Sequence, residues 1–536
     1  MNGIADHTPR GMIEAALLKS PQELLETARS IHQTGDRMRK NLERGYQEWL
    51  SEAENAYNAL LNRSILGSPQ EGQLPAFILL LLGMMDQQRG WNGRAVSIAR
   101  LAEAYARNMP EQTQANRNLL ANILALQGYG LRAEGFRVEA EERFKGAMDL
   151  SPDDPEILAG CAGIYINDGH PQKVIDLLNR AEKLKPGMTK EEHWNLALAH
   201  LELGHWHIGF DLYHKGIAGK ERLNQNYWAS GTTPEWDGSP GKSVVIYGEQ
   251  GLGDEIMFAS ILPEAIRTCR KVIIDCHPRL EEIFRRSFQG CEVFGTRKSS
   301  LHEWAAGRAD IDAQCALGTL GKFFRSKDAD FPQYNTGYME ADHRQVLAMR
   351  HRLMELGPGP YIGIAWSGGS KKTRFDLRSA PLKLWAPLLG LPAKFVSIHY
   401  MPEAAEAAER FGIPHWQEVI DDMDSQFALV KACDLIISVN QTLVHVAGSL
   451  AKPCWTLTPG RPAWRYGLDG TRMIWYPTVR QFRQRLVGDT EEPWQFVFER
   501  VVPELQGFIR KWADPGLQGM IREMSMVVDR RGLEAS

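Results

Sequence analysis

The stretch that decides the fold of the second half of this chain is "IYGEQGLGDEIMF", residues 246 to 258. A β-branched and aromatic run leads into it at 243–247, and the apolar residues over 255–266 recur at helical spacing, so we expect a strand, a glycine turn and a helix. Gly251 and Gly253 let the backbone turn sharply, and the free amides of the new helix favour an anion there. Asp254 does not fit this site, because a carboxylate repels a phosphate. It is either the N-cap of the helix or it faces a different reactant.

Length and composition predict a soluble globular protein of several domains. At 536 residues the chain is too long for a single core, and usual domain sizes predict about three or four domains. Hydrophobic residues make up 43% and charged residues 24%, with a formal net charge of -4. This near-neutral balance lacks the excess of basic residues typical of nucleic-acid-binding proteins, so we expect no nucleic-acid partner.

Cysteine usage and hydropathy predict a cytoplasmic protein. The 7 cysteines are scattered with no C-x-x-C pair, which favours reduced thiols and disfavours a disulfide or zinc framework. The N-terminal residues lack a basic stretch followed by an apolar core, so we expect no secretory signal. The apolar run at 74–85 is too short for a membrane span and predicts a buried helix.

Residue types recur 34 positions apart between 135 and 186, which is the tetratricopeptide period. The pairs are Gly135 and Gly169, Phe144 and Leu178, Ala147 and Ala181, and Pro152 and Pro186. A third copy, slipped by one residue, runs from Trp194 to Gly216. Each unit has a small pivot between two helices, apolar residues on the second helix and a proline that ends it. Ordinary helical hairpins of coincidental spacing are the alternative.

We therefore expect tetratricopeptide repeats over 111–228, preceded by a helical region over 1–110 that shows no clean repeat. The amphipathic stretch 38–64 is either a solvated hairpin or a docking helix. Stacked helix pairs leave a concave face that usually holds a peptide or protein. The front half is accordingly predicted to recognise a protein.

The residue composition changes at about residue 229, where a linker rich in proline, glycine and serine begins. Strands are expected at 243–247, 271–275, 291–294, 361–366, 394–399, 434–439 and 453–457, most of them separated by helical runs. Short apolar strands interleaved with helices belong to parallel sheets covered on both faces. A break near 354–360 predicts two such sheets, which would place a ligand between the carboxyl ends of their strands.

Two loops of the second sheet are suited to binding a phosphate. The loop 366–379 carries two glycines beside its basic residues, which are Lys371, Lys372, Arg374 and Arg378. The segment 438–450 is a strand end followed by a helix whose first turn offers Gln441, Thr442 and exposed amides, with His445 one turn further on. A solvated basic loop and a structural histidine remain the alternatives.

Four stretches occur together in the order seen in one family. They are "GEQGLGDEIMFASILPE" (248–264), "GIAWSG" (363–368) with its basic loop, "ACDLIISVNQTLVHVAGSLAKPCW" (432–455) and "WYPTVRQFRQ" (475–484). The chain resembles bacterial tetratricopeptide-repeat proteins with a glycosyltransferase domain. That domain is similar to the ADP-heptose lipopolysaccharide heptosyltransferases, which have the GT-B fold of two Rossmann-like domains. Closest in layout are the soluble transferases that glycosylate flagellin and similar surface proteins.

The resemblance implies an α plus α/β chain with an acceptor-side Rossmann-like domain at 229–357. A nucleotide-sugar-side domain with C-terminal helices would follow at 358–536. Asp254 matches the acid that the family uses as general base. The residues implied on the donor phosphate side are Gly251, Gly253, Ser367, Lys371, Lys372, Arg374, Asn440, Gln441, Thr442 and His445, with no metal and no other cofactor.

The sequence also departs from its relatives at two places. Many relatives read S-V-D-T where this chain has S-V-N-Q at 438–441, and Asn440 keeps a hydrogen-bonding side chain but lacks the charge, so a metal or cationic partner is not expected there. The motif that reads D-W-R-W in relatives is A-W-R-Y at 463–466 in this chain. The difference bears on which nucleotide base or sugar is selected.

The leading hypothesis is an inverting, metal-independent glycosyltransferase. It would move a sugar from a nucleotide donor to serine or threonine of a protein, flagellin or another surface protein, held by the repeats. A carboxylate on a rigid turn can take the proton of the acceptor hydroxyl. The alternatives are a repeat scaffold or chaperone with an inactive transferase-like domain, and a transferase acting on a saccharide.

Overall fold

The computed structural model describes residues 8–17, 20–40, 46–65, 73–109, 113–166, 169–216, 233–297, 302–333, 336–369, 375–487 and 490–513. The chain divides into two compact units. The first takes the helices up to Ile166 together with Gln172–Gly187, and the second takes the segment 167–171 and the chain from Met188 onward.

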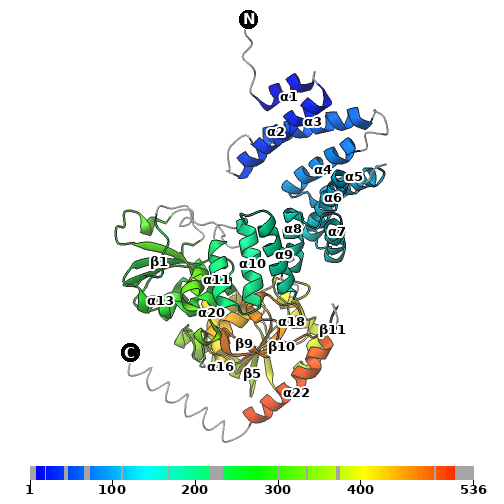
Figure 1. Cartoon of the computed structure of the whole chain (residues 1–536). Coiled ribbons are helices and arrows are strands. Elements are labelled where there is room, and N and C mark those ends of the chain that lie inside the picture. The colour runs from blue at the N-terminus through cyan, green and yellow to red at the C-terminus, as the bar shows by residue number, and fades with distance from the viewer. Residues whose placement is uncertain are drawn as a thin grey trace. The chain divides into compact units, whose positions relative to one another are not determined.

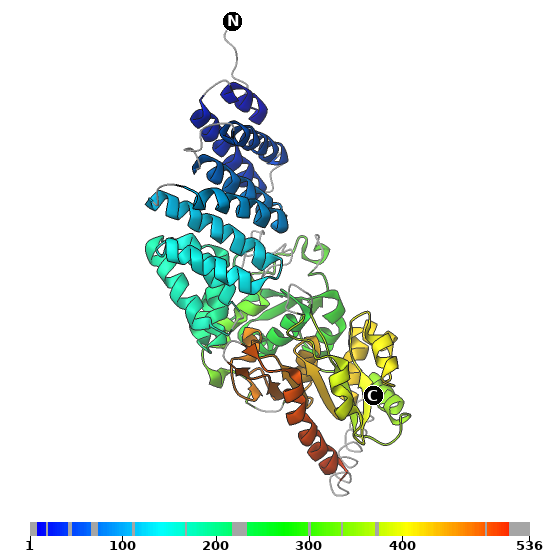
Figure 2. The same ribbon diagram turned by 90° about the vertical axis from the view of Figure 1, so that its right-hand side faces the viewer.

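The first unit is helical, and successive helices pack in pairs. Its helices are α1 (Pro9–Leu17), α2 (Pro21–Lys40), α3 (Tyr46–Ile65), α4 (Gln73–Gln88), α5 (Asn92–Arg107), α6 (Gln114–Ala133), α7 (Arg137–Leu150), α8 (Pro155–Tyr165) and α9 (Pro171–Leu184). Figure 2 shows the blue and cyan pairs stacked one upon the next. The apolar run 74–85 lies in α4, whose side chains are mostly buried, as predicted. None of the helices in the described part of the chain is long and apolar enough to cross a membrane.

The predicted repeat positions have clear structural roles. Gly135 and Gly169 both take left-handed backbone conformations, with φ of 91° and 74°, where one helix turns into the next. Phe144 is 1% exposed, and a Cβ on Gly128 of the preceding helix would lie 2.5 Å from its ring. The small residue thus lets two helices approach closely around a buried aromatic side chain.

The second unit begins with a helix pair and continues into two parallel sheets. Its main helices are α10 (Lys190–Glu202), α11 (Trp206–Lys215), α12 (Leu252–Phe258), α13 (Leu262–Thr268), α14 (Glu281–Ser287), α15 (Leu320–Phe324), α16 (His343–Met354), α17 (Ala386–Leu389), α18 (Ala404–Arg410), α19 (Gln417–Asp421), α20 (Met423–Ala432), α21 (Thr442–Ser449) and α22 (Trp494–Trp512). Figure 1 shows α10 and α11 alongside the sheet region, and both contact its short helical segments. The pair lies within 111–228, where repeats are expected, yet it belongs to the same compact unit as the sheets.

The first sheet has the strand order β3-β2-β1-β4, and all its strands are parallel. The strands are β1 (Ser243–Tyr247), β2 (Lys271–Asp275), β3 (Glu292–Phe294) and β4 (Ala313–Ala316). Every residue of the central strand β1 is buried. The helix expected over 255–266 is divided: α12 ends at Phe258, a 3₁₀ turn follows, and α13 begins with Pro263 in its first turn. Proline lacks the amide that a continuous helix would need at this position.

The second sheet has the order β6-β5-β7-β8-β10-β9, parallel except for its last strand. The strands are β5 (Tyr361–Ala365), β6 (Lys394–Ser397), β7 (Leu435–Val439), β8 (Cys454–Thr458), β9 (Arg472–Met473) and β10 (Tyr476–Arg483), and a separate hairpin pairs β11 (Leu486–Val487) with β12 (Thr490–Glu491). The sequence predicted this architecture, in which helical repeats are followed along the chain by two parallel α/β sheets. Strands β4 and β10 and the short strands β9, β11 and β12 lay outside that prediction.

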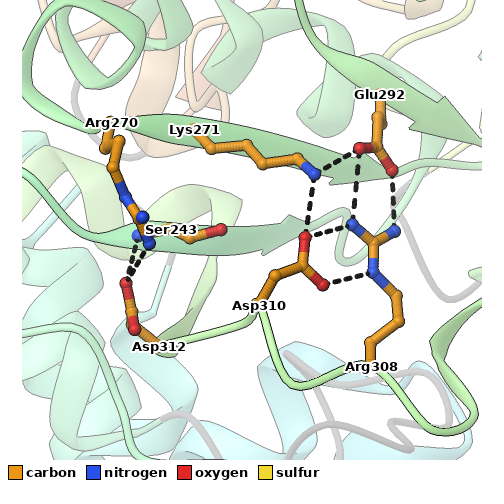
Figure 3. Close-up of polar contacts among 7 residues, drawn as sticks. All are labelled: Ser243, Arg270, Lys271, Glu292, Arg308, Asp310 and Asp312. Carbon is orange, nitrogen blue, oxygen red and sulfur yellow. Dashed lines mark hydrogen bonds and ion pairs between the residues drawn. The ribbon is translucent and has the colours of Figure 1, made fainter.

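A network of ion pairs ties together the strand starts of the first sheet (Figure 3). Lys271 at the start of β2 and Arg308 both contact Glu292 at the start of β3, and both contact Asp310. Asp312 accepts from the Ser243 amide at 2.7 Å and pairs with Arg270. The network lies at the amino ends of the strands, at the opposite end of the sheet from the glycine turn, and because its side chains are partly exposed each pair adds little stability.

Candidate functional site

The glycine turn after β1 leads directly into α12 and brings Asp254 into its first turn. Gly251 is the N-cap, with no side-chain capping bond, and the Glu255 amide donates to the Gly251 carbonyl at 3.1 Å. The N-cap interpretation of Asp254 is therefore wrong. Its carboxylate is instead ion-paired with Arg465, and the two side chains are 18% and 16% exposed. Arg465 comes from a 3₁₀ turn (Trp464–Tyr466) that follows β8 of the second sheet.

The first turns of α12 and α21 lie against each other. A Cβ on Gly253 would be 3.0 Å from His445 Cδ2 and 3.4 Å from Thr442 Oγ1. Only glycine permits this distance without a shift of its neighbours. Gln441 is the N-cap of α21, in extended conformation and without a side-chain capping bond. The structure thus brings Gly251, Gly253, Asp254, Thr442 and His445 together after the carboxyl ends of two parallel strands, β1 and β7.

His445 is buried and neutral. Its Nδ1 lies 3.0 Å from the Tyr476 hydroxyl of β10, and the side chain is 3% exposed. Burial holds the pKa of His445 well below its ordinary value, and the nearby cations Arg465 and Arg378 lower it further. A neutral imidazole acts as a hydrogen-bonding group and carries no charge.

Asn440 and Gln441 point their side chains into the second sheet. The side-chain oxygen Oδ1 of Asn440 accepts hydrogen bonds from the Thr456 hydroxyl at 2.7 Å and from the Thr458 hydroxyl at 3.1 Å, both on β8. Gln441 donates to the Ser438 hydroxyl at 3.3 Å. Both residues are at least 95% buried, being 1% and 5% exposed. In this arrangement they support the α21 turn, and the backbone amides of that turn are the groups left for an anion.

The loop after β5 contributes Ser367 and Arg378. Ser367 is buried, and its hydroxyl lies 2.8 Å from Nε2 of His399. Burial lowers the pKa of His399 to about 3, and His415 adds a smaller effect in the same direction. Arg378 donates to the backbone carbonyl of Asn440 at 3.3 Å. Burial lowers the pKa of the Arg378 guanidinium. Lys371, Lys372 and Arg374 lie outside the residues that the structure describes.

The glycine loop rests on a buried ion pair. Glu255 is fully buried, accepts from the His277 amide at 2.7 Å and lies 3.3 Å from Arg297 Nε. Burial is the largest influence on this carboxyl and raises its pKa to about 7, against the opposing charge of Arg297. Arg297 also donates to the Gln250 carbonyl at 2.9 Å. A Cβ on Gly248 would be 2.4 Å from the Glu255 carboxyl carbon, so this loop sits directly on the pair.

Sequence reasoning did not assign Arg465, Tyr476, Glu255 or Arg297 to the site. Arg465 was visible only as part of the A-W-R-Y departure, and Tyr476 as part of the "WYPTVRQFRQ" stretch. Among the residues that the structure describes, no three histidine, cysteine, aspartate or glutamate side chains are grouped as ligands for one metal ion. A cavity of about 550 Å³ lies elsewhere in this unit, lined in part by Glu264, Arg325 and Tyr338.

Comparison with known proteins identifies the repeats. Residues 131–201 match the model of the tetratricopeptide repeat family, which confirms the predicted presence of these repeats in this part of the chain. Protein FlbA of Caulobacter vibrioides is 32% identical over 295 residues. The alignment covers 51% of this chain and 48% of that protein, so the chain matches about half the length of this relative.

Two solved structures match parts of this chain at low sequence identity. BtubC (BKLC) from P. vanneervenii is 14% identical, with a TM-score of 0.31, and the match covers 43% of this chain and 96% of that chain. ADP-heptose lps heptosyltransferase II from E. coli is 11% identical, with a TM-score of 0.33, and the match covers 51% of this chain and 100% of that chain.

Proposed function

We propose that this chain is an inverting glycosyltransferase that moves a sugar from a nucleotide-sugar donor to a serine or threonine hydroxyl of a protein. The observation that carries the proposal is the position of Asp254. It lies on a glycine turn at the carboxyl end of one parallel sheet, in contact with an arginine from the other. A general base and a cation for the leaving phosphate are thereby adjacent at the junction of the two sheets.

The donor phosphates are assigned to the second sheet. Arg378, Arg465 and the amides at the start of α21 provide positive charge and donors in one region. Neutral His445, held by Tyr476, adds a hydrogen bond. These groups would neutralise the leaving nucleoside phosphate in place of a metal.

The Asp254–Arg465 pair must open for turnover. When an anionic donor binds, Arg465 turns towards its phosphates, and the Asp254 carboxylate becomes available to the acceptor. The acceptor oxygen then forms a bond to the anomeric carbon while the bond from that carbon to the phosphate oxygen breaks. The hydroxyl proton passes to Asp254, and the nucleotide leaves with the electron pair. Attack from the face opposite the leaving group inverts the anomeric centre.

The protein acceptor is assigned to the repeats. Tetratricopeptide units present an extended surface that suits a protein better than a small saccharide. Flagellin or another surface protein, modified in the cytoplasm before export, is the acceptor that we propose. Calorimetry of the full chain with UDP, GDP, CMP and ADP in EDTA tests the donor half of the proposal. Binding of one nucleotide without metal is expected, whereas binding that requires magnesium or manganese contradicts it.

One observation favours a second candidate, a repeat scaffold whose sheets no longer catalyse. The Asp254 carboxylate is paired with an arginine and mostly covered, which is also how a purely structural ion pair is arranged. A scaffold would still capture its protein partner but would bind no nucleotide and add no mass to that partner. The same calorimetry, followed by intact-mass measurement of the partner, separates the two functions.

A further inference from the structure

The helix pair α10–α11 contacts both halves of the candidate site. Helix α10 packs against the 3₁₀ turn Trp464–Tyr466, which carries Arg465. Helix α11 packs against α15 and against the 3₁₀ turn Leu317–Thr319 that follows β4. One hairpin from the end of the repeat region, seen beside the sheets in Figure 1, therefore packs on the turn that supplies Arg465, and through Tyr213 of α11 it contacts the loop that leads to Asp254.

Tyr213 of α11 holds the residue that opens the glycine turn. Its ring is fully buried, and its hydroxyl accepts a hydrogen bond from Gln250 Nε2. Gln250 has a φ of 58°, in the left-handed region that residues other than glycine rarely adopt. Such a conformation persists only where the surroundings hold it, and here the Arg297 guanidinium holds the carbonyl while Tyr213 holds the side chain. Gln250 directly precedes Gly251, the N-cap of the helix that carries Asp254.

Two glycines allow α11 to pack closely against the segments that follow β4 of the first sheet. A Cβ on Gly318 would lie 2.7 Å from the Tyr213 ring and 2.2 Å from Glu249 Oε1, and a Cβ on Gly321 would lie 2.3 Å from the Phe210 ring. The Gly318 amide donates to Glu249 at 2.7 Å, so the same glycine contacts both the loop and the helix. Contacts this close leave α11 little room to shift without moving the loop.

Aromatic packing continues to the arginine side of the site. Phe210 lies edge-to-face with Trp464, with ring centroids 6.4 Å apart. Arg465 lies over the Trp464 ring at 5.6 Å. Phe258, at the end of α12, stacks near Trp464 with centroids 6.3 Å apart. The α11 face is thus connected through neighbouring side chains to both members of the Asp254–Arg465 pair.

From these contacts we infer that Tyr213 is a positioning residue for the glycine turn, and that the α10–α11 hairpin sets the geometry of the Asp254–Arg465 pair. The hairpin would then be a working part of the transferase site at the end of the acceptor-binding repeats. Its significance for catalysis rests on the proposed function. The order of the glycine turn can be measured without turnover.

Hydrogen–deuterium exchange of the full chain tests the inference. Tyr213→Phe removes only the hydroxyl that holds Gln250, so we expect peptides covering 248–258 to exchange roughly tenfold faster, with the melting temperature little changed. Tyr165→Phe is the matched control, because that hydroxyl bonds Glu141 in the first unit. The control should leave exchange at 248–258 as in the wild type. Unchanged exchange at 248–258 in Tyr213→Phe would overturn the inference.

A double variant and a kinetic measurement complete the test. If Tyr213 acts through Gln250, Tyr213→Phe combined with Gln250→Ala should exchange no faster at 248–258 than Gln250→Ala alone. Additive effects would contradict the connection. Where the wild type transfers sugar, Tyr213→Phe should lower kcat several-fold with little change in nucleotide affinity. A wild type that transfers nothing defeats the proposed function but leaves the exchange result to decide this inference.

Discussion

The carboxylate of Asp254 and the guanidinium of Arg465 form an ion pair between two sheets, across 211 positions of sequence. Neither side chain is fully covered, at 18% and 16% exposure. An ion pair at a junction between sheets can open when an anion competes for the arginine, and this is the step on which the proposed chemistry depends.

Replacing Arg465 or Arg378 by alanine should weaken nucleotide binding. Loss of a charge-assisted contact to phosphate costs about 1.5 to 3 kcal/mol, which is roughly ten- to a hundred-fold in affinity. Arg480→Ala is the matched control, since Arg480 lies on β10 but pairs with Glu504 at the surface. Calorimetry with the nucleotide that binds the wild type measures the effect. Equal affinities in all three variants would remove both arginines from the donor site.

Gly253→Ala should separate the starts of α12 and α21. The added Cβ would lie 3.0 Å from His445, and inserting a methyl group into a packed site costs about 1 to 3 kcal/mol. Gly507→Ala in α22 is the control, because its Cβ would meet nothing within 4 Å. That change should be neutral or stabilising, as alanine favours helix. Thermal unfolding compares the two, and equal melting temperatures would show that Gly253 is not needed for the close approach.

The buried imidazole of His399 should make the second sheet sensitive to acid. Its folded-state pKa of about 3 lies below the ordinary value of 6.5, so its contribution is present above pH 6.5 and is lost as the pH falls towards 3. Between pH 7 and pH 5 this one group should cost about 2 kcal/mol of unfolding free energy.

His399→Gln removes the titration and should flatten the pH dependence of denaturant unfolding by that amount. His351→Gln, at an exposed position on α16, is the matched control and should keep the wild-type dependence. If His399→Gln and the wild type lose stability in parallel from pH 7 to pH 5, the imidazole is protonated without penalty and its assigned environment is wrong.

A fragment that begins at Met188 should fold, whereas one that begins at Gly231 should not fold stably. The shorter fragment loses Trp206, Phe210 and Tyr213, which are 7%, 0% and 0% exposed. Burying an aromatic side chain contributes about 1.5 to 3 kcal/mol, so their joint loss approaches the whole stability of a typical domain. Circular dichroism melts of the two fragments measure this. Equal cooperative melts would show that α10 and α11 are dispensable for the sheets.

Features encoded locally were predictable from the sequence. The 34-residue spacing of Gly135 and Gly169 reflects the left-handed turn that each repeat needs. The apolar strands β1, β2 and β7 were found because their residues are buried on both faces. Strand β4, "AQCA", has no β-branched residue, and β10, "YPTVRQFR", mixes proline, glutamine and arginines, so propensity did not reveal either one.

Features that depend on distant pairing were not predictable from the sequence. Asp254 was singled out, yet its partner Arg465 lies 211 positions away and carries no local signal. The structural role of Tyr213 likewise depends on contact with Gln250, from another element. Periodicity and turn chemistry report what a segment does alone, and the site is made where several segments meet.

The central claim is that Asp254 takes a proton from a protein hydroxyl during sugar transfer. The most direct measurement is glycopeptide mass spectrometry of surface proteins from cells that carry either the wild-type gene or Asp254→Asn at equal protein levels. Asparagine has nearly the shape of aspartate but cannot accept the proton. We predict that the sugar mass on serine and threonine peptides disappears in Asp254→Asn cells, while the purified variant binds nucleotide within a few-fold of the wild type. Identical glycopeptide masses and occupancies in the two strains would contradict the proposal.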